Sequence, residues 1–126
     1  MSDTTSWIAV VVEDMYDDVQ LISKILTHYG ITVYAASNGN ECLKLLKDIE
    51  PTIIVTDLAM PGKDGWQTLA AIRADPKTAY IPVIAVTAYH SAAVAQDVLR
   101  AGFNGYFPKP VDPFTFVQSL SKIIAS

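Results

Sequence analysis

Short apolar runs rich in β-branched residues recur along the chain, and each is bounded by residues that favour turns. Runs of this length and composition are typical of strands that are buried on both faces of a sheet. Asp57 directly follows one of these runs, and the Pro/Gly-rich segment after it favours a loop over an immediate helix. The pattern predicts strands over residues 8–12, 32–35, 53–55, 82–87 and 103–107.

Between the apolar runs, hydrophobic residues recur every three or four positions, which is the spacing of one helical face. In the first of these segments Val19, Ile22 and Ile25 share such a face, and Gly30 follows as a helix stop. The fourth helical segment is expected to carry Val94, Val98 and Leu99, and the last is expected to face inward with Phe114, Val117, Leu120 and Ile124. Predicted strands and predicted helices therefore alternate along the chain.

Small polar residues stand where these helices are expected to begin. Their side chains can accept hydrogen bonds from the unpaired N–H groups of a first helical turn. Asn38, followed three residues later by Glu41, resembles a capping box. Asp112 is the predicted cap of the last helix, and the following Pro113 suits the first helical position. The predicted caps are Asp17, Asn38, Asp64, Ser91 and Asp112.

The alternation of strands and helices predicts an α/β fold with a parallel sheet, right-handed crossovers and helices on both faces. A length of 126 residues fits one domain. We expect that domain to occupy residues 1–126, with its core in about 7–125. The last helix is expected to end at the chain terminus, so no output domain is visible.

Polar side chains follow the predicted strands at their carboxyl ends, which in a parallel sheet meet at the edge where ligands bind. They are Glu13, Asp14, Asp57, Thr87 and Lys109. Three crowded carboxylates repel one another, and a hard divalent cation such as Mg²⁺ relieves that repulsion through oxygen ligands. Asp57 can then act as a nucleophile toward phosphorus, while Lys109 and Thr87 hold the phosphoryl oxygens.

Charge and composition narrow the possible partners. A net charge of −4 and a pI of about 4.9, with no basic stripe, argue against nucleic-acid binding by this domain. The apolar run at residues 8–12 is far shorter than the roughly 20 residues of a membrane helix. The polar lead over residues 1–6 lacks the features of a signal peptide. Cys42 has no partner for an internal disulfide and is interpreted as a small buried hydrophobe, so we expect a cytoplasmic protein.

Together these residues resemble the receiver domain of two-component response regulators, the CheY-like family. The resemblance covers almost the whole chain, and the joint spacing of its motifs is highly specific. It rests on Glu13-Asp14, on Asp57 within TDLAMPGKDG, on Thr87 within VIAVTAY, on Tyr106 and on Lys109-Pro110. It implies a (βα)5 doubly wound, five-stranded parallel sheet of order 2-1-3-4-5, as in flavodoxin-like and CheY-like folds.

The resemblance also implies a chemistry. In that family a phosphoryl group passes from a phosphohistidine of a sensor histidine kinase, or of a phosphotransfer protein, to the aspartate matched here by Asp57. Asp14 is then expected to ligate Mg²⁺ directly, and Glu13 mainly through water. The backbone carbonyl of Ala59 is expected to be a further ligand, and Mn²⁺ is expected to substitute for Mg²⁺.

A conformational switch is the second implication of the resemblance. The Lys109–Pro110 peptide bond is expected to be cis, which proline tolerates. Tyr106 matches the family's switch aromatic, whose ring turns inward when the threonine moves toward the phosphate. The fourth helix, fifth strand and fifth helix are therefore expected to form the signalling surface for a downstream protein target.

Two departures from the family pattern concern metal affinity and phosphoryl lifetime. Glu13 stands where Asp is common, which we expect to alter metal affinity slightly. Ala59 and Tyr89 occupy variable positions at which the dephosphorylation rate is tuned in the family. The neighbouring His90 is interpreted as a solvated loop residue.

Three other functions fit parts of this pattern. A phosphatase of the haloacid-dehalogenase class also uses a strand-end Asp, but it needs a second Asp two residues later, where this chain has Ala59. A flavodoxin-like binder needs a phosphate-friendly loop after the first strand, where acidic residues of this chain would repel a phosphate. A receiver-like interaction module that works without phosphorylation usually lacks part of the acid pair or the lysine, and this chain keeps both. We therefore expect a signalling phosphoacceptor rather than an enzyme with an external substrate.

Overall fold

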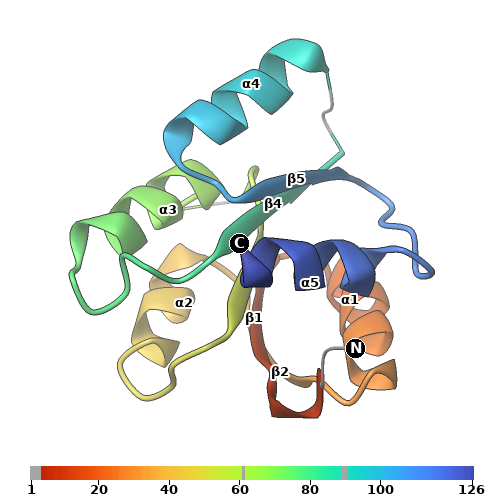
Figure 1. Ribbon diagram of the computed structural model, residues 1–126. Coiled ribbons are helices and arrows are strands. Elements are labelled where there is room, and N and C mark those ends of the chain that lie inside the picture. The colour runs from red at the N-terminus through yellow and green to blue at the C-terminus, as the bar shows by residue number, and fades with distance from the viewer. Residues whose placement is uncertain (1–3, 61, 89–90) are drawn as a thin grey trace.

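The computed structural model of the chain describes residues 4–60, 62–88 and 91–126. Strands and helices alternate along them, as the sequence pattern predicts (Figure 1). The strands are β1 (Ile8–Val12), β2 (Thr32–Ala36), β3 (Ile53–Asp57), β4 (Val83–Thr87) and β5 (Gly105–Pro108). A short 3-10 turn, η1 (Thr4–Ser6), precedes the helices α1 (Tyr16–His28), α2 (Gly39–Leu45), α3 (Gly65–Ala74), α4 (Ala92–Ala101) and α5 (Phe116–Ala125). β4 begins one residue, and β5 two residues, later than the apolar pattern predicts.

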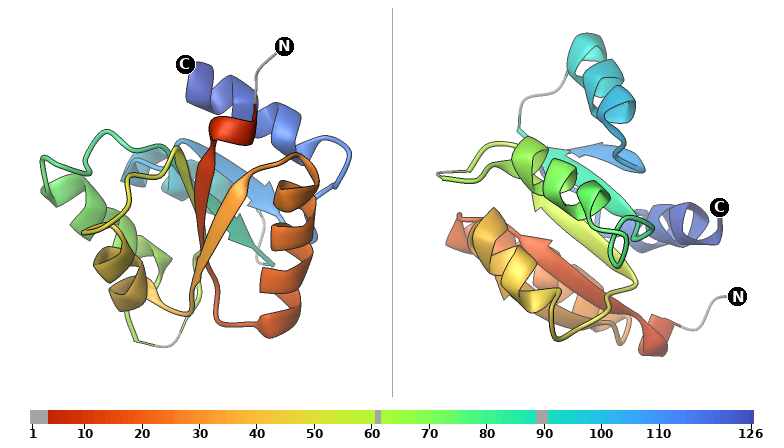
Figure 2. Two further views of the ribbon diagram at one scale, coloured as in Figure 1. Left: turned by 90° about the horizontal axis from the view of Figure 1, so that it is seen from below. Right: turned by 90° about the vertical axis from the view of Figure 1, so that its left-hand side faces the viewer.

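The strands form one parallel sheet in the order β2-β1-β3-β4-β5, which confirms the predicted fold class and strand order. In β1, Ala9 and Val11 belong to the core shared with α1 and α5, whereas Val10 and Val12 belong to the core shared with α2, α3 and α4. The helices thus form two layers, one on each face of the sheet (Figure 1, Figure 2). Because both faces of the inner strands are covered, their sequences are continuous apolar runs rather than alternating ones.

Hydrogen bonds confirm three of the predicted helix caps. The capping side chains accept from backbone N–H groups three residues on, in the pairs Asn38–Glu41, Asp64–Gln67 and Ser91–Val94. At Asp64 the capping box is complete, because the Gln67 side chain also accepts from the Asp64 N–H. At Asn38 it is incomplete, because the Glu41 carboxylate accepts instead from the N–H and the hydroxyl of Ser37.

The ends of the helices agree with the sequence pattern except in α2. Gly30 and Gly102 follow α1 and α4 with φ of +80° and +108°, a conformation that glycine adopts without strain. The helical spacing of Cys42, Leu45 and Ile49 predicts a helix that reaches Ile49, but α2 ends at Leu45, so Ile49 lies in the following loop, although it still packs against the core. Cys42 is buried in α2, as expected for a small hydrophobe, and burial raises the pKa of its thiol to about 12.

Helix α1 begins before its predicted cap. Its N-cap is Met15, which has an extended backbone and makes no side-chain capping bond. Asp17 therefore lies inside the first turn, and its predicted capping role is wrong. The early start follows from the end of β1, where the Glu13 carboxylate accepts from the Met15 N–H at 3.1 Å and turns the chain directly into the helix.

Helix α5 begins later than predicted, after Thr115 as its N-cap. The Asp112 carboxylate accepts from the Phe114 N–H at 2.8 Å in the turn before the helix, so its predicted role as helix cap is wrong. The later start leaves Phe114 outside the buried face with 84% of its surface exposed, and its predicted inward position is also wrong. On α4, Leu99 is exposed because it lies about 100° around the helix from the buried Val98.

Among the described residues, no helix has both the length and the apolar composition needed to cross a bilayer. Pro61, Tyr89 and His90 lie outside the described residues. The expected loop conformation at Pro61, the rate-tuning position Tyr89 and the solvated position of His90 therefore stay predictions.

Candidate functional site

The carboxyl ends of the strands bring the sequence-predicted residues to one edge of the sheet. Glu13 directly follows β1, Asp57 is the last residue of β3, and Thr87 is the last residue of β4. Lys109 follows β5, and its backbone N–H donates to the Thr87 carbonyl at 2.9 Å. The Lys109–Pro110 peptide bond is cis, as the family resemblance implies.

Three carboxylates gather at this edge. Glu13, Asp14 and Asp57 each offer one carboxylate oxygen, and these oxygens lie within 4.8 Å of one another. Glu13 and Asp57 are buried whereas Asp14 is exposed, so the acid cluster opens to solvent on the side of Asp14. A partly hydrated set of oxygen ligands suits a hard divalent cation rather than zinc, which favours nitrogen and sulfur. The acid cluster can therefore bind a metal ion of the Mg²⁺ type.

The ammonium group of Lys109 lies against this cluster. Its Nζ is 2.7 Å from Glu13 Oε2 and 2.9 Å from Asp57 Oδ2. A further carboxylate, that of Asp18 in the first turn of α1, lies 2.8 Å away. Burial alone would lower the pKa of Lys109, but its hydrogen bonds to these three carboxylates outweigh burial and hold that pKa above its ordinary value. Lys109 therefore stays protonated and supplies a positive charge at the site.

The surroundings of Glu13 also change its pKa. Its burial opposes ionisation, and the charge of Asp57 adds to that effect. The hydrogen bonds from Lys109 and from the Met15 N–H favour the charged form but offset burial only in part, so the pKa of Glu13 rises to about 7. In the absence of a bound cation, Glu13 therefore exchanges its proton near neutral pH.

The loop that follows β3 folds back over the end of that strand. The Ala59 N–H donates to Asp57 Oδ1 at 3.3 Å, and the Gly65 N–H donates to the Leu58 carbonyl at 3.1 Å. A Cβ atom on Gly65 would lie 2.2 Å from the Asp57 carbonyl oxygen, so only glycine allows this close approach. The start of α3 is thereby packed against the backbone of Asp57.

Three further residues that the sequence predicts for the site lie at or near the carboxyl edge of the sheet, but no contact among the described residues demonstrates their roles. Thr87 is buried at the end of β4. Tyr106 is half-buried on β5, in register with Ala85 of β4, and packs against the core shared with α2, α3 and α4. Ala59 is exposed beside Asp57. Their roles as phosphoryl contact, switch and metal ligand stay predictions.

Asp18 is a site residue that sequence reasoning missed. An acidic residue at this position suits the positive end of a helix, and that local role gives no sign of a contact with Lys109, which is 91 positions away. The position of Asp18 in the sequence could have indicated that it lies near the site, because a helix that directly follows the first strand places its first turn at the carboxyl edge of the sheet. That signal indicates proximity to the site but does not identify the partner.

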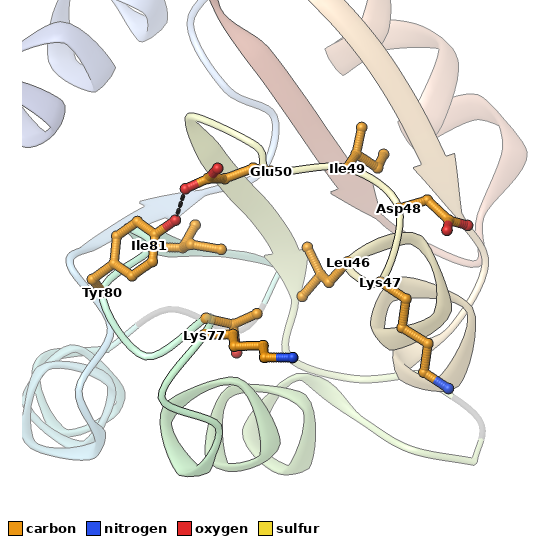
Figure 3. A pocket seen from close by; sticks show the side chains of 9 residues that line it. Leu46, Lys47, Asp48, Ile49, Glu50, Lys77, Tyr80 and Ile81 are labelled. Carbon is orange, nitrogen blue, oxygen red and sulfur yellow. Dashed lines mark hydrogen bonds between the residues drawn. The ribbon is translucent and has the colours of Figure 1, made fainter.

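A hollow of about 340 Å³ lies elsewhere on the molecule (Figure 3). It is lined by the loops before β3 and β4, including Glu50, Lys77 and Tyr80, and the Tyr80 hydroxyl donates to the Glu50 carboxylate. Loops that precede parallel strands lie at the amino edge of the sheet, away from the acid cluster. The hollow therefore plays no part in the site at Asp57.

Known proteins resemble this chain in sequence and in fold. The family model of the response regulator receiver domain matches residues 9–121. A 14.6 kDa protein of Leptolyngbya boryana is 39% identical over 109 residues, which make up 86% of this chain and 83% of that protein. Chemotaxis protein CheY-3 of Vibrio cholerae is 31% identical over 115 residues, which cover 90% of this chain and 88% of CheY-3.

A solved structure of a receiver domain is also similar to this chain. The receiver domain of sensor histidine kinase PA1611 from Pseudomonas aeruginosa PAO1, which has a magnesium ion coordinated in its active-site cleft, superposes with a TM-score of 0.87. It is 26% identical, and the match covers 95% of this chain and 98% of that one. Fold, strand-end residues and family match agree, and the chain belongs to the family of response regulator receiver domains of two-component signalling.

Proposed function

We propose that Asp57 is the phosphoacceptor of this receiver domain, and that its phosphoryl group comes from a phosphohistidine of a sensor histidine kinase or of a phosphotransfer protein. The main support is the position of Lys109 Nζ, 2.9 Å from Asp57 Oδ2 and next to the acid cluster. An ammonium in this position can hold an oxygen of a phosphoryl group that becomes attached to Asp57.

The proposed reaction is a displacement at phosphorus. An oxygen of the Asp57 carboxylate forms the new O–P bond while the N–P bond of the phosphohistidine breaks, and the electron pair of that bond stays on the imidazole nitrogen. The products are an acyl phosphate on Asp57 and a free histidine. Lys109 and Thr87 contact the phosphoryl oxygens and stabilise the charge that develops on them. The domain thus catalyses only its own phosphorylation and, with water as the nucleophile, its own dephosphorylation.

The cofactor that suits the acid cluster best is Mg²⁺, and Mn²⁺ can take its place because both cations prefer oxygen ligands. Asp14 and Asp57 would bind the cation directly, Glu13 mainly through water, and Ala59 through its backbone carbonyl. A bound cation supplies positive charge that offsets the acids and the incoming phosphoryl group. The magnesium ion in the receiver domain of PA1611 supports this choice by analogy.

The output of the domain is a change in its interaction surface. Thr87 ends β4, and Tyr106 lies on the neighbouring strand β5. Movement of Thr87 toward the phosphoryl group would let the Tyr106 ring turn inward and alter the face formed by α4, β5 and α5. We propose that this face binds a downstream protein, that residues 1–126 act as a single receiver domain, and that the protein works in the cytoplasm.

Intact mass spectrometry tests the proposal. Wild-type protein incubated with Mg²⁺ and acetyl phosphate should gain the mass of one phosphoryl group, and Asp57→Asn should gain none. Asp97→Asn, on the exposed surface of α4, is the matched control and should label like the wild type. An unlabelled wild type would favour the alternative function, an interaction module that works without phosphorylation. Full labelling of Asp57→Asn would move the acceptor to another residue.

A further inference from the structure

We infer that Asp18 is a positioning residue that occupies one hydrogen bond of the Lys109 ammonium and has to release it before Lys109 can hold a phosphoryl oxygen. Asp18 would thereby limit the rate at which Asp57 is phosphorylated. This inference rests on the proposed phosphoacceptor function and adds a residue that lies outside the acid cluster.

The first argument is the number of donors on Lys109. A lysine ammonium has three N–H donors. Glu13, Asp18 and Asp57 accept from Lys109 Nζ at 2.7, 2.8 and 2.9 Å. In the loose transition state Asp57 is still largely a carboxylate, so the incoming phosphoryl group adds strong acceptor oxygens next to the same Nζ while all three partners still accept. One of the three existing partners therefore has to give up its hydrogen bond.

The second argument is burial, which makes Asp18 the partner that leaves most readily. The side chains of Glu13 and Asp57 are 2% and 9% exposed, whereas that of Asp18 is 37% exposed. Water can replace Lys109 at an exposed carboxylate at little cost. At a buried carboxylate the loss of the ammonium leaves an uncompensated charge, which is far less favourable.

The third argument is the place of Asp18 in the fold. Its carboxylate comes from the first turn of α1, whereas the acid cluster comes from the ends of β1 and β3. A change at Asp18 therefore leaves Glu13, Asp14 and Asp57 in position. With asparagine at position 18, only a neutral amide oxygen competes with the phosphoryl group for the third donor of Lys109.

The experiment compares initial rates of labelling by acetyl phosphate at saturating Mg²⁺, measured by intact mass. Asp18→Asn should label roughly fivefold faster than the wild type, the scale set by one partly exposed ion pair. Asp17→Asn is the matched control, because Asp17 carries the same charge in the same helical turn and makes no hydrogen bond or ion pair with Lys109 among the described residues. Asp17→Asn and Asp18→Glu should both label at close to the wild-type rate.

A second measurement reports on Lys109 without phosphorylation. The ¹⁵N signal of the Lys109 ammonium should shift in Asp18→Asn and stay unchanged in Asp17→Asn. Equal labelling rates in these two variants, a slower Asp18→Asn or an unshifted signal would overturn the role of Asp18 while leaving Asp57 as the acceptor. A wild type that does not label at all would overturn the phosphoacceptor function, and the role of Asp18 with it.

Discussion

Lys109 Nζ lies 2.7 Å from Glu13 Oε2, although 96 positions separate the two residues in the sequence. The contact joins the carboxyl ends of β1 and β5, between which β3 and β4 lie in the sheet. Lys109 stays charged at neutral pH, because three carboxylates raise its pKa against the effect of burial. The protonation state of Glu13 changes near neutral pH, because its burial raises its pKa to about 7. The stability of the domain should therefore depend on pH through Glu13.

The first prediction concerns that pH dependence in the absence of divalent cations. A carboxyl group with a higher pKa in the folded than in the unfolded chain binds its proton more tightly when folded. Its contribution to stability is complete below the unfolded pKa of 4.5 and is lost as the pH rises through about 7. Over this window Glu13 should reduce the free energy of unfolding by about 1–3 kcal/mol. Denaturant unfolding in EDTA at several pH values should show a smaller decline for Glu13→Gln, and parallel curves would contradict the assignment.

Lys109→Ala should slow the phosphorylation of Asp57 by about 100-fold, which is the usual effect of removing one donor to a developing oxyanion. Binding of Mg²⁺ should persist and tighten, because the variant keeps the acid cluster and loses a competing positive charge. Labelling rates and calorimetric titration with Mg²⁺ measure the two effects. Lys122→Ala, on the exposed side of α5, should match the wild type in both. A large loss of Mg²⁺ affinity in Lys109→Ala would rule out a role confined to the phosphoryl group.

The parallel sheet and the gathering of the site residues could be predicted because both follow from local patterns, whereas the strand order was implied only by the family resemblance. Continuous apolar runs identify strands covered on both faces, and alternation with helices makes the sheet parallel. The carboxyl ends of parallel strands then share one edge. Glu13, Asp57 and Lys109 could be placed together in this way without any knowledge of their contacts.

The failures occurred where one particular side-chain hydrogen bond overrides the general preference of a residue type. Asp17 and Asp112 are good capping residues, but a Glu13 hydrogen bond starts α1 earlier and a turn at Asp112 delays α5. Phe114 consequently lies on the surface. The contact of Asp18 with Lys109 has no periodicity and no motif, so it depends on side-chain positions that only the folded structure shows.

Gly65→Ala should destabilise the domain by about 3 kcal/mol, the upper end of the range for overpacking. The new Cβ would meet the Asp57 carbonyl oxygen at 2.2 Å, and the backbone can relieve that clash only by moving α3 away from β3. Gly62→Ala is the control, because its φ of +74° is strained for alanine but its Cβ would meet no atom within 4 Å. Its cost should be about 1 kcal/mol. Thermal and denaturant unfolding compare the two, and equal costs would show that the close approach at Gly65 is not limiting.

Phosphorylation should change the α4–β5–α5 face as well as the site. Tyr106 lies on β5 and packs in the core that also contains Val98 of α4, so a turn of its ring should disturb both elements. Chemical shifts recorded with a beryllofluoride mimic of the phosphoryl group should therefore change at Val98 and Tyr106. The amide of Tyr29, beyond the far end of α1, should change little. Shifts confined to the loops around Asp57 would show that no signal reaches this face.

Mg²⁺ should stabilise the wild-type domain, because the acid cluster exists in the folded chain and not in the unfolded one. By mass action the free energy of unfolding rises by about 2.7 kcal/mol when the Mg²⁺ concentration is 100 times the dissociation constant.

Asp14→Asn is the most direct variant for this test. Asp14 belongs to the acid cluster but, unlike Glu13 and Asp57, forms no ion pair with Lys109 among the described residues. Without metal this variant should melt no lower than the wild type, since it removes one of three crowded charges. Its melting temperature should rise less when Mg²⁺ is added, whereas Asp17→Asn should gain as much as the wild type. An equal gain in Asp14→Asn would remove Asp14 from the ligands, and no gain in the wild type would mean that the acids repel one another without binding a cation.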